Sequence, residues 1–206
     1  MTYTTFDDLC GKIESRFKGV RKLPLRSSLD LSSVLVNGPV LDFGCGKGGP
    51  LGRGPKIVTF DPDPEVNAQY KTLEDLSSFY TRPDGGLHGI MANQVFEHIP
   101  RDMIAETLEK LSACMNSGAS MIVTLPNVCN WFKYIGDIDH KTPLAFFHMG
   151  AYMEMAGLDV VDAYYCTKRY AEIREGTVEE QAILSVLSKY FEMTPAHFVA
   201  VRGVKK

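Results

Sequence analysis

The chain has 206 residues, a formal net charge of −3 and a hydrophobic content of 45%. This length predicts one buried core and a single domain over residues 1–206, with 1–37 as an N-terminal helical cover and 38–206 as the main fold. Without a net positive charge, a protein that depends on binding the nucleic-acid backbone is disfavoured, so we expect a small-molecule partner and no nucleic acid.

The five cysteines are odd in number and include no C-x-x-C pair. They are interpreted as reduced core residues, in preference to a disulfide framework or a zinc site, and no spacing of His, Cys and Asp predicts a metal. The polar N-terminus does not resemble a signal peptide, and no run approaches the roughly 18 apolar residues of a membrane span. We therefore expect a cytoplasmic protein with no membrane partner.

Apolar runs and helical patterns alternate along the chain. Helices are predicted over 5–17 and 28–36, followed by strands over 39–43, 56–60, 69–73 and 88–93. The second half has helices over 101–114, from Thr142 to Gly157 and over 178–191, with strands over 119–125, 158–166 and 196–204. This alternation predicts an α/β, doubly wound sheet of seven strands, most of them parallel.

The first two connections between strands are short. Eight residues separate Gly48 from Ile57, and they include three glycines and two prolines, so at most one helical turn fits there. Residues 62–68 contain two prolines, which predicts a loop or a single turn. Part of the sheet would then be thinly covered, and either the N-terminal helices or a second copy of the chain, forming a homodimer, would cover it.

A glycine-rich turn follows the strand over 39–43. The segment from Pro39 to Gly48 is PVLDFGCGKG, in which the glycines let the backbone turn tightly and approach a ligand closely. The next apolar run ends in Asp61, which a neighbouring parallel strand would deliver beside the turn, within reach of a ribose. The pattern therefore predicts a nucleotide-type pocket.

Asp42 discriminates between nucleotides. The glycine spacing from Gly44 to Gly49 also satisfies G-x-G-x-x-G, a pattern of dinucleotide sites in which the turn surrounds a pyrophosphate. A carboxylate two residues before the first glycine would repel those phosphates. It is compatible with S-adenosylmethionine, which carries a sulfonium and an ammonium, so this cofactor is favoured over NAD and an NAD-dependent oxidoreductase is the less favoured alternative.

Residues 40–48 resemble the first motif of the class I S-adenosylmethionine-dependent methyltransferases, (V/L)-L-(D/E)-x-G-x-G-x-G, at every position. Residues 91–99, MANQVFEHI, are similar to the "vlEHi" segment of many small-molecule and glycan methyltransferases. Looser similarities at 115–127 and 157–161 extend the resemblance over about residues 38 to 165. The resemblance implies a Rossmann-like fold whose antiparallel last strand lies between the fifth and sixth, with S-adenosyl-L-methionine as cofactor and S-adenosyl-L-homocysteine as product.

The resemblance also implies roles for particular residues. The backbone of Gly44 and Gly46 would lie against the methionine part of the cofactor, with Asp42 near its amino end and Asp61 on the ribose hydroxyls. Asp75 would follow the strand over 69–73, where the family often places an acid near the adenine, although it could instead cap a turn. The full set of expected cofactor-binding residues is Asp42, Gly44, Cys45, Gly46, Asp61, Asp75, Asn93 and Gln94.

Methyl transfer depends mainly on in-line positioning, and a general base helps only some acceptors, such as hydroxyls. His140 lies in a polar loop similar to the "D.tH..p" segment of glycan methyltransferases, and His98 lies next to Glu97. Both histidines are candidate catalytic residues, and both also fit a structural role. The leading hypothesis is a methyltransferase acting on oxygen or nitrogen of a small molecule, a sugar or glycan intermediate included. The alternative is a binding or regulatory protein of the same fold.

Overall fold

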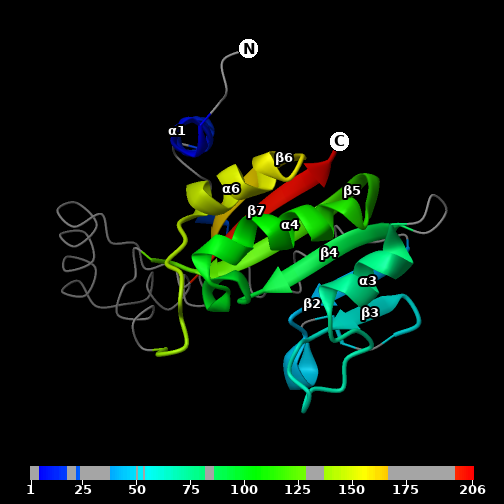
Figure 1. Cartoon of the computed structure of the whole chain (residues 1–206). Coiled ribbons are helices and arrows are strands. Elements are labelled where there is room, and N and C mark those ends of the chain that lie inside the picture. The colour runs from blue at the N-terminus through cyan, green and yellow to red at the C-terminus, as the bar shows by residue number, and fades with distance from the viewer. Residues whose placement is uncertain are drawn as a thin grey trace.

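The structure is a computed structural model that describes residues 5–17, 22–23, 38–49, 51–52, 54–81, 86–128, 137–166 and 198–206. The described strands form one twisted sheet in the order β1-β6-β7-β5-β4-β2-β3 (Figure 1). Their bounds are β1 Lys22–Leu23, β2 Val40–Phe43, β3 Ile57–Phe60, β4 Leu87–Asn93, β5 Met115–Pro126, β6 Leu158–Cys166 and β7 Phe198–Lys205.

The strand directions are those of a Rossmann-like fold of the methyltransferase type. Strands β3, β2, β4 and β5 run parallel to one another. The last strand, β7, lies between β5 and β6 and is antiparallel to both. The predicted mixed sheet with an antiparallel last strand is therefore confirmed.

The predicted strand over 69–73 is wrong. Tyr70 makes only an isolated parallel bridge to Phe60, and a helix begins three residues later. Thr72 caps this helix, α3 (Leu73–Tyr80), because its Oγ1 accepts a hydrogen bond of 3.1 Å from the Asp75 N–H. The seventh strand of the described sheet is instead the two-residue β1, which was not predicted. The other six strands have four or more residues, and the predicted set of seven is not confirmed.

Three longer helices follow the prediction with one correction. Helices α1 (Phe6–Arg16) and α4 (Ile104–Ala113) fall within the predicted ranges, but α6 (Phe146–Met155) begins four residues later than expected. Thr142 does not start it, because the Thr142 N–H and Oγ1–H donate to the carbonyl oxygens of Glu97 and Ile99. The helix ends as predicted just before Gly157, whose φ is 82°. The helices predicted over 28–36 and 178–191 lie outside the described residues.

The short connections are confirmed. Between β2 and β3 the described residues, which leave out 50 and 53, form the 3₁₀ turn η2 (Gly46–Gly48) and no other helix, and residues 61–69 after β3 contain no helix. Two further 3₁₀ turns, η3 (Phe96–His98) and η4 (Arg101–Met103), follow β4 and lead into α4. Consequently the carboxyl ends of β2, β3 and β4 carry irregular backbone, which positions the site described below.

Helices α3, α4 and α6 pack on one face of the sheet (Figure 1), where their apolar side chains meet those of the strands in the main core. Helix α1 packs on α6, and Gly150 permits this contact because a Cβ there would lie 2.8 Å from Ile13 Cγ2. The expectation that N-terminal helices cover the thin part of the sheet is therefore wrong for α1. A second, smaller cluster on the opposite face consists of Val40, Met91, Ile122 and Ala200, with Leu51, Ile57, Tyr164 and Phe198 against it.

Within the described segments, no helix combines the length and the apolar character needed to cross a bilayer.

Candidate functional site

The glycine turn is tied to the end of β3. The N–H groups of Gly44 and Cys45 both donate to the Phe60 carbonyl oxygen, at 2.8 and 3.1 Å. Gly44 has φ 70°, and a Cβ there would lie 2.5 Å from Val95 Cγ2. Only glycine satisfies both requirements, so the turn is packed tightly between β3 and the segment that follows β4.

Asp61 lies beside this turn, as the sequence predicts. Its carboxylate is nearly buried, and its two oxygens accept from different N–H groups: Oδ2 from Gly46 at 2.8 Å and Oδ1 from Asp63 at 3.0 Å. These bonds fix the orientation of the carboxylate at the carboxyl end of β3. Each oxygen keeps a further acceptor site, so two ribose hydroxyls could still donate to this side chain.

Asp42 is fully buried beneath the turn. Its Oδ1 has no hydrogen-bond partner among the described residues, and its Oδ2 accepts only a long bond of 3.4 Å from the Leu51 N–H. Burial raises the pKa of this carboxyl from 3.8 to about 6. Gly49 must be glycine for Asp42 to fit, since a Cβ would lie 2.1 Å from Oδ2. The site thus contains an unsatisfied buried acceptor, which a cationic or N–H-bearing ligand would satisfy.

A hollow of about 190 Å³ opens between the turn and the β3 end of the sheet. A Cβ built on Gly46 or Gly48 would meet no atom within 4 Å, so the backbone of the turn faces open space. The residues present therefore fit a ligand with an amino-acid end and a ribose. The hollow is lined by Asp42, Cys45, Gly46, Lys47, Gly48, Gly49, Gly52, Thr59 and Asn67.

Asn93 and Gln94 end β4 in a hydrogen-bonded group with a residue that the sequence analysis missed. Thr124, fully buried on β5, donates to Asn93 Oδ1 at 2.9 Å and accepts from the Gln94 N–H at 3.2 Å. Gln94 has φ 57°, a conformation that this network supports. The signal for Thr124 was a hydroxyl within the otherwise apolar run 121–126. Asn93 and Gln94 directly precede Val95, which packs against Gly44. They therefore lie beside the glycine turn.

Asp75 lies apart from this hollow. It is exposed in the first turn of α3, where its Oδ2 accepts from Thr72 Oγ1 at 2.8 Å. The strand predicted before it does not form, and Asp75 does not cap a turn either, because it lies inside a helix whose cap is Thr72. Its contact with the adenine stays a prediction.

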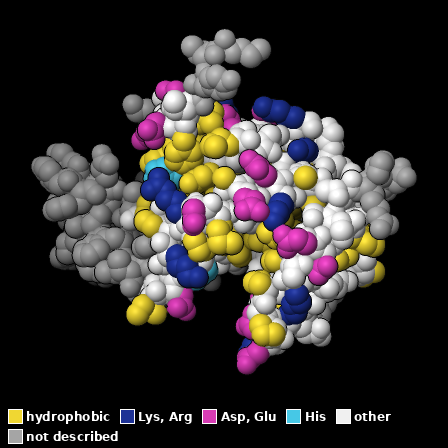
Figure 2. All heavy atoms as spheres, in the orientation of Figure 1, with side chains coloured by type: hydrophobic (Ala, Val, Ile, Leu, Met, Phe, Trp, Pro, Cys, Tyr) yellow, Lys and Arg dark blue, Asp and Glu magenta, His cyan; other side chains and the backbone are white. Residues whose placement is uncertain are grey.

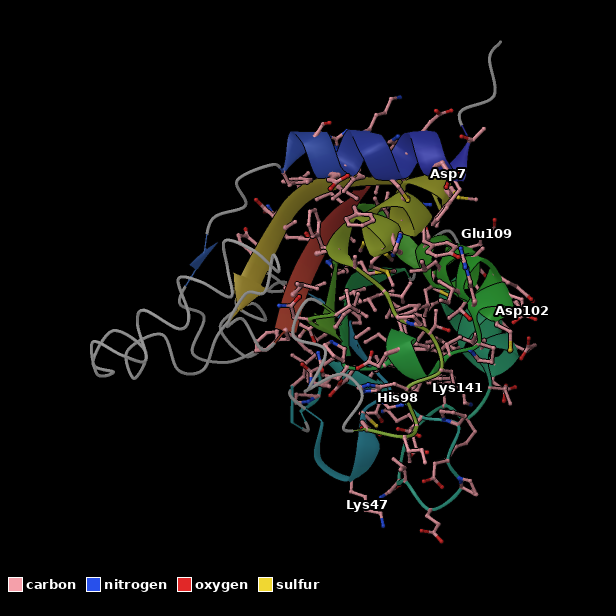
Figure 3. All side chains as sticks on the ribbon, turned by 90° about the vertical axis from the view of Figure 1, so that its left-hand side faces the viewer. Asp7, Lys47, His98, Asp102, Glu109 and Lys141 are labelled. Atoms are coloured by element: carbon pink, nitrogen blue, oxygen red, sulfur yellow. The ribbon has the colours of Figure 1, made fainter. Side chains whose placement is uncertain are left out.

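The two histidines lie together near the carboxyl end of β4. Their ring centroids are 5.1 Å apart, and His98 Nδ1 lies 3.1 Å from the Asp139 carbonyl oxygen. The loop that carries His140 is held against η3 because the N–H groups of Lys141 and Thr142 donate to the Glu97 carbonyl oxygen at 2.7 and 3.0 Å. Figure 3 shows His98 beside Lys141, at the end of the molecule where Lys47 projects from the glycine turn.

Glu97 lies between these elements and is 1% exposed. Neither of its carboxylate oxygens has a hydrogen-bond partner within the described part of the chain. Burial raises the pKa of this carboxyl from 4.5 to about 8. The sequence analysis mentioned Glu97 only as a neighbour of His98, because nothing in the local pattern indicates that its side chain is buried.

The surface is hollowed between these two groups of residues. Figure 2 shows a notch in the lower edge of the molecule. In the same orientation, Figure 1 places the loop before α6 on one side of the notch and the turn η2 with the loop after β3 on the other. The glycine turn and the histidine loop therefore face each other across a common opening, as expected at the carboxyl ends of parallel strands.

A parallel sheet with a glycine turn, a buried acid within it and a second acid at the end of the next strand defines a nucleotide-binding α/β protein. The comparisons make the assignment more specific. The family model described as "Methyltransferase domain" matches residues 15–163, well over half of the chain. The chain belongs to this family, and the predicted class I S-adenosylmethionine-dependent methyltransferase is confirmed at that level.

Solved structures share the fold. A S-adenosylmethionine-dependent methyltransferase from Archaeoglobus fulgidus superposes with a TM-score of 0.65 at 19% identity, over 97% of this chain and 96% of that one. A chain of the Haloferax volcanii complex between the Trm112 methyltransferase activator and a "putative methyltransferase" superposes with a TM-score of 0.55 at 16% identity, over 97% of both chains. The cyclopropane synthase MmaA2 of Mycobacterium tuberculosis gives 0.54 at 13% identity, over 87% of this chain and 83% of that one. A search among curated proteins finds no match.

Proposed function

We propose that this methyltransferase transfers the methyl group of S-adenosylmethionine to an oxygen or nitrogen atom of a small molecule, with a sugar or glycan intermediate as the acceptor class to test first. The observation that carries the proposal is the pair of buried carboxylates around the glycine turn: Asp61 with both oxygens oriented, and Asp42 with one unsatisfied oxygen. When bound, the cofactor supplies the methyl group on a good leaving group. The protein therefore has to bind the cofactor and orient the acceptor atom in line with the methyl group.

Each part of the turn suits a different part of this cofactor. The carboxylate of Asp61 would accept from the ribose hydroxyls, and the open backbone of Gly46 would lie along the methionine part. The buried charge of Asp42 favours the ammonium end, because an unsatisfied carboxylate attracts a cation strongly where the dielectric is low. The same charge would oppose the pyrophosphate of a dinucleotide.

The acceptor would enter through the notch, facing the histidine loop. His140 and His98 lie at its edge, and either imidazole could take a proton from an acceptor hydroxyl as the methyl group is transferred. An amine acceptor would need no base. We therefore propose a catalytic role for a histidine only with hydroxyl acceptors.

The experiment is methyl transfer from isotope-labelled S-adenosylmethionine to panels of nucleotide sugars, free sugars, phenols and amines, read by mass spectrometry. Product with a hydroxyl compound, reduced about 100-fold or more in His140→Ala or His98→Ala at unchanged cofactor affinity, would support the proposal. His88→Ala is the matched control, since His88 is exposed on β4. Cofactor binding with no transfer to any acceptor class would favour the alternative, a binding protein of the same fold.

The homodimer is retained as a proposal. It rests on the short connections after β2 and β3, and light scattering across protein concentrations tests it: a monomer at every concentration would exclude it.

A further inference from the structure

The region between η3 and the loop before α6 brings together three side chains that can ligate a metal ion. Glu97, His98 and His140 each offer one ligand atom, and these atoms all lie within 4.8 Å of one another. Two of the residues are adjacent in sequence, but the third comes from a loop about forty residues later. Hydrogen bonds from the N–H groups of Lys141 and Thr142 to the Glu97 carbonyl oxygen hold the two parts of the cluster together.

Glu97 supplies the observation that points to a ligand. Its carboxylate is 1% exposed and has no hydrogen-bond partner in the described segments. Leaving a carboxylate buried and unpaired is strongly unfavourable, and buried charges in proteins are normally paired or coordinate metal ions. Within the part of the chain that the structure describes, no lysine or arginine side chain forms an ion pair with Glu97.

The histidines are oriented as metal ligands usually are. Such an imidazole commonly donates its second ring N–H to a carbonyl or carboxylate oxygen, which fixes the tautomer and the ring plane. His98 has this arrangement, with Nδ1 at 3.1 Å from the Asp139 carbonyl oxygen. His140 has Nε2 at 3.7 Å from Asp137 Oδ2. In both rings a nitrogen faces an oxygen atom of the segment 137–139, and each ring offers one ligand atom to the cluster.

The distances are compatible with coordination after small side-chain rotations. Zn²⁺ binds histidine nitrogen and carboxylate oxygen at about 2.0–2.2 Å, which places tetrahedral ligand atoms roughly 3.3 Å apart. Ligand atoms that now lie within 4.8 Å need to approach by no more than about 1.5 Å. Two imidazoles and one carboxylate form a donor set that suits Zn²⁺ and other divalent transition ions, and it leaves a coordination position open.

We propose that Glu97, His98 and His140 form a binding site for a divalent transition-metal ion. An acceptor hydroxyl that reached the open coordination position of such an ion would have its pKa lowered, and with the ion bound His98 and His140 would act as ligands and not as proton acceptors. The proposal goes beyond the methyltransferase assignment and does not depend on it, because the ligands lie outside the hollow beside the glycine turn.

The test measures metal binding on the full chain, freed of any affinity tag and stripped with a chelator. Zn²⁺ is titrated in competition with a chromophoric indicator, and bound metal is counted by plasma mass spectrometry. We expect one equivalent bound with micromolar or tighter affinity, and Co²⁺ in place of Zn²⁺ should give the visible absorption of a low-symmetry site. Each of Glu97→Gln, His98→Ala and His140→Ala should weaken Zn²⁺ binding at least about 10- to 100-fold.

His88→Ala is the matched control, since it removes an exposed histidine elsewhere on β4 and should leave the affinity unchanged. Glu97→Gln keeps the shape of the side chain and removes the carboxylate that would ligate the ion, so it decides the question even if a histidine variant folds poorly. Wild-type protein that binds less than a tenth of an equivalent, or a Glu97→Gln variant that binds Zn²⁺ as tightly as wild type, would overturn the proposal. A zinc-induced rise in melting temperature that persists in Glu97→Gln would also overturn it.

Discussion

The two halves of the sheet are built for different purposes. Strands β4 to β7 have seven to twelve residues, and α4 and α6 cover them with fully buried side chains such as Leu108 and Met149. Strands β2 and β3 have four residues each, and the segments after them are a 3₁₀ turn and a loop. The buried groups at their ends are the carboxylates of Asp42 and Asp61. The long-strand half (β4–β7) therefore carries most of the packing, and the short-strand half (β2 and β3) leaves backbone open for a ligand.

The largest expected effect tests the packing of the long-strand half. Leu108→Ala should destabilise the protein by about 2–5 kcal/mol, because Leu108 is fully buried in α4 and its removal leaves a cavity. Ile138→Ala, at a 96% exposed position in the loop before α6, should change stability by less than about 0.5 kcal/mol. Urea unfolding measures both, and equal effects would contradict the tight packing of α4 on the long-strand half.

The second prediction concerns how tightly the glycine turn packs against Val95, on the side of Gly44 where a Cβ would lie. Gly44→Ala should cost about 2–4 kcal/mol, since it forces a side chain into the left-handed region and against Val95. Gly11→Ala in α1 is the control: its Cβ meets no atom within 4 Å, and it should stabilise by about 0.5–1 kcal/mol. Thermal melts of the two variants should shift in opposite directions, and a neutral Gly44→Ala would show that the turn is loosely packed.

Asp42, in the short-strand half, should lower the free energy of unfolding of the protein as the pH rises. Burial raises its pKa to about 6, so the folded state holds the proton more tightly than the unfolded state, in which the pKa is near 3.8. Its contribution to stability is complete below about pH 4 and is lost as the pH rises through about 6.

Asp42→Asn should therefore stabilise the free protein by up to about 3 kcal/mol near pH 8 and hardly at all near pH 4, while it weakens binding of S-adenosylhomocysteine. Urea unfolding of both proteins across this range checks the first part, and calorimetry checks the second. A stability difference that does not vary with pH would contradict the buried, unsatisfied state of Asp42.

The smallest expected effect concerns the N-terminal helix. Arg16 Nη1 donates to Glu154 Oε1 and to the Val160 carbonyl oxygen, each at 2.9 Å, and so ties α1 to α6 and β6. The side chain is 46% exposed, so Arg16→Ala should cost only about 1 kcal/mol in a thermal melt. Glu14→Ala, on the exposed side of the same helix, should have no effect. A loss as large as that of Leu108→Ala would show that this ion pair, and not the burial of Ile13 in the main core, holds α1 in place.

The sequence predicts the short-strand half well, because its signals are local. A short apolar run followed by glycines specifies β2 and its turn, and Asp61 follows directly from the end of β3. The strand over 69–73 fails because only Tyr70 bridges to Phe60 before Thr72 starts α3. The sequence contains two competing signals there: apolar residues typical of a strand, and Thr72 three residues before Asp75, a pattern typical of a helix N-terminus. The capping pattern determines the structure.

The group around Glu97 could not be predicted from local patterns. Its position depends on backbone hydrogen bonds from Lys141 and Thr142, about forty residues away. The same bonds hold Thr142 in the loop, which explains why α6 begins late. Long-range pairing of this kind leaves no periodic trace in the sequence.

The central claim is that the short-strand half binds S-adenosylmethionine through Asp61, and isothermal titration with S-adenosylhomocysteine tests it directly. Wild-type protein should bind one equivalent, and Asp61→Ala should bind at least about 100-fold more weakly, since it loses charge-assisted hydrogen bonds to the ribose. Asp159→Ala, which removes an exposed carboxylate of β6 that pairs with Lys206, should bind like wild type. Retained affinity in Asp61→Ala, or wild-type protein that binds NAD in place of S-adenosylhomocysteine, would contradict the account.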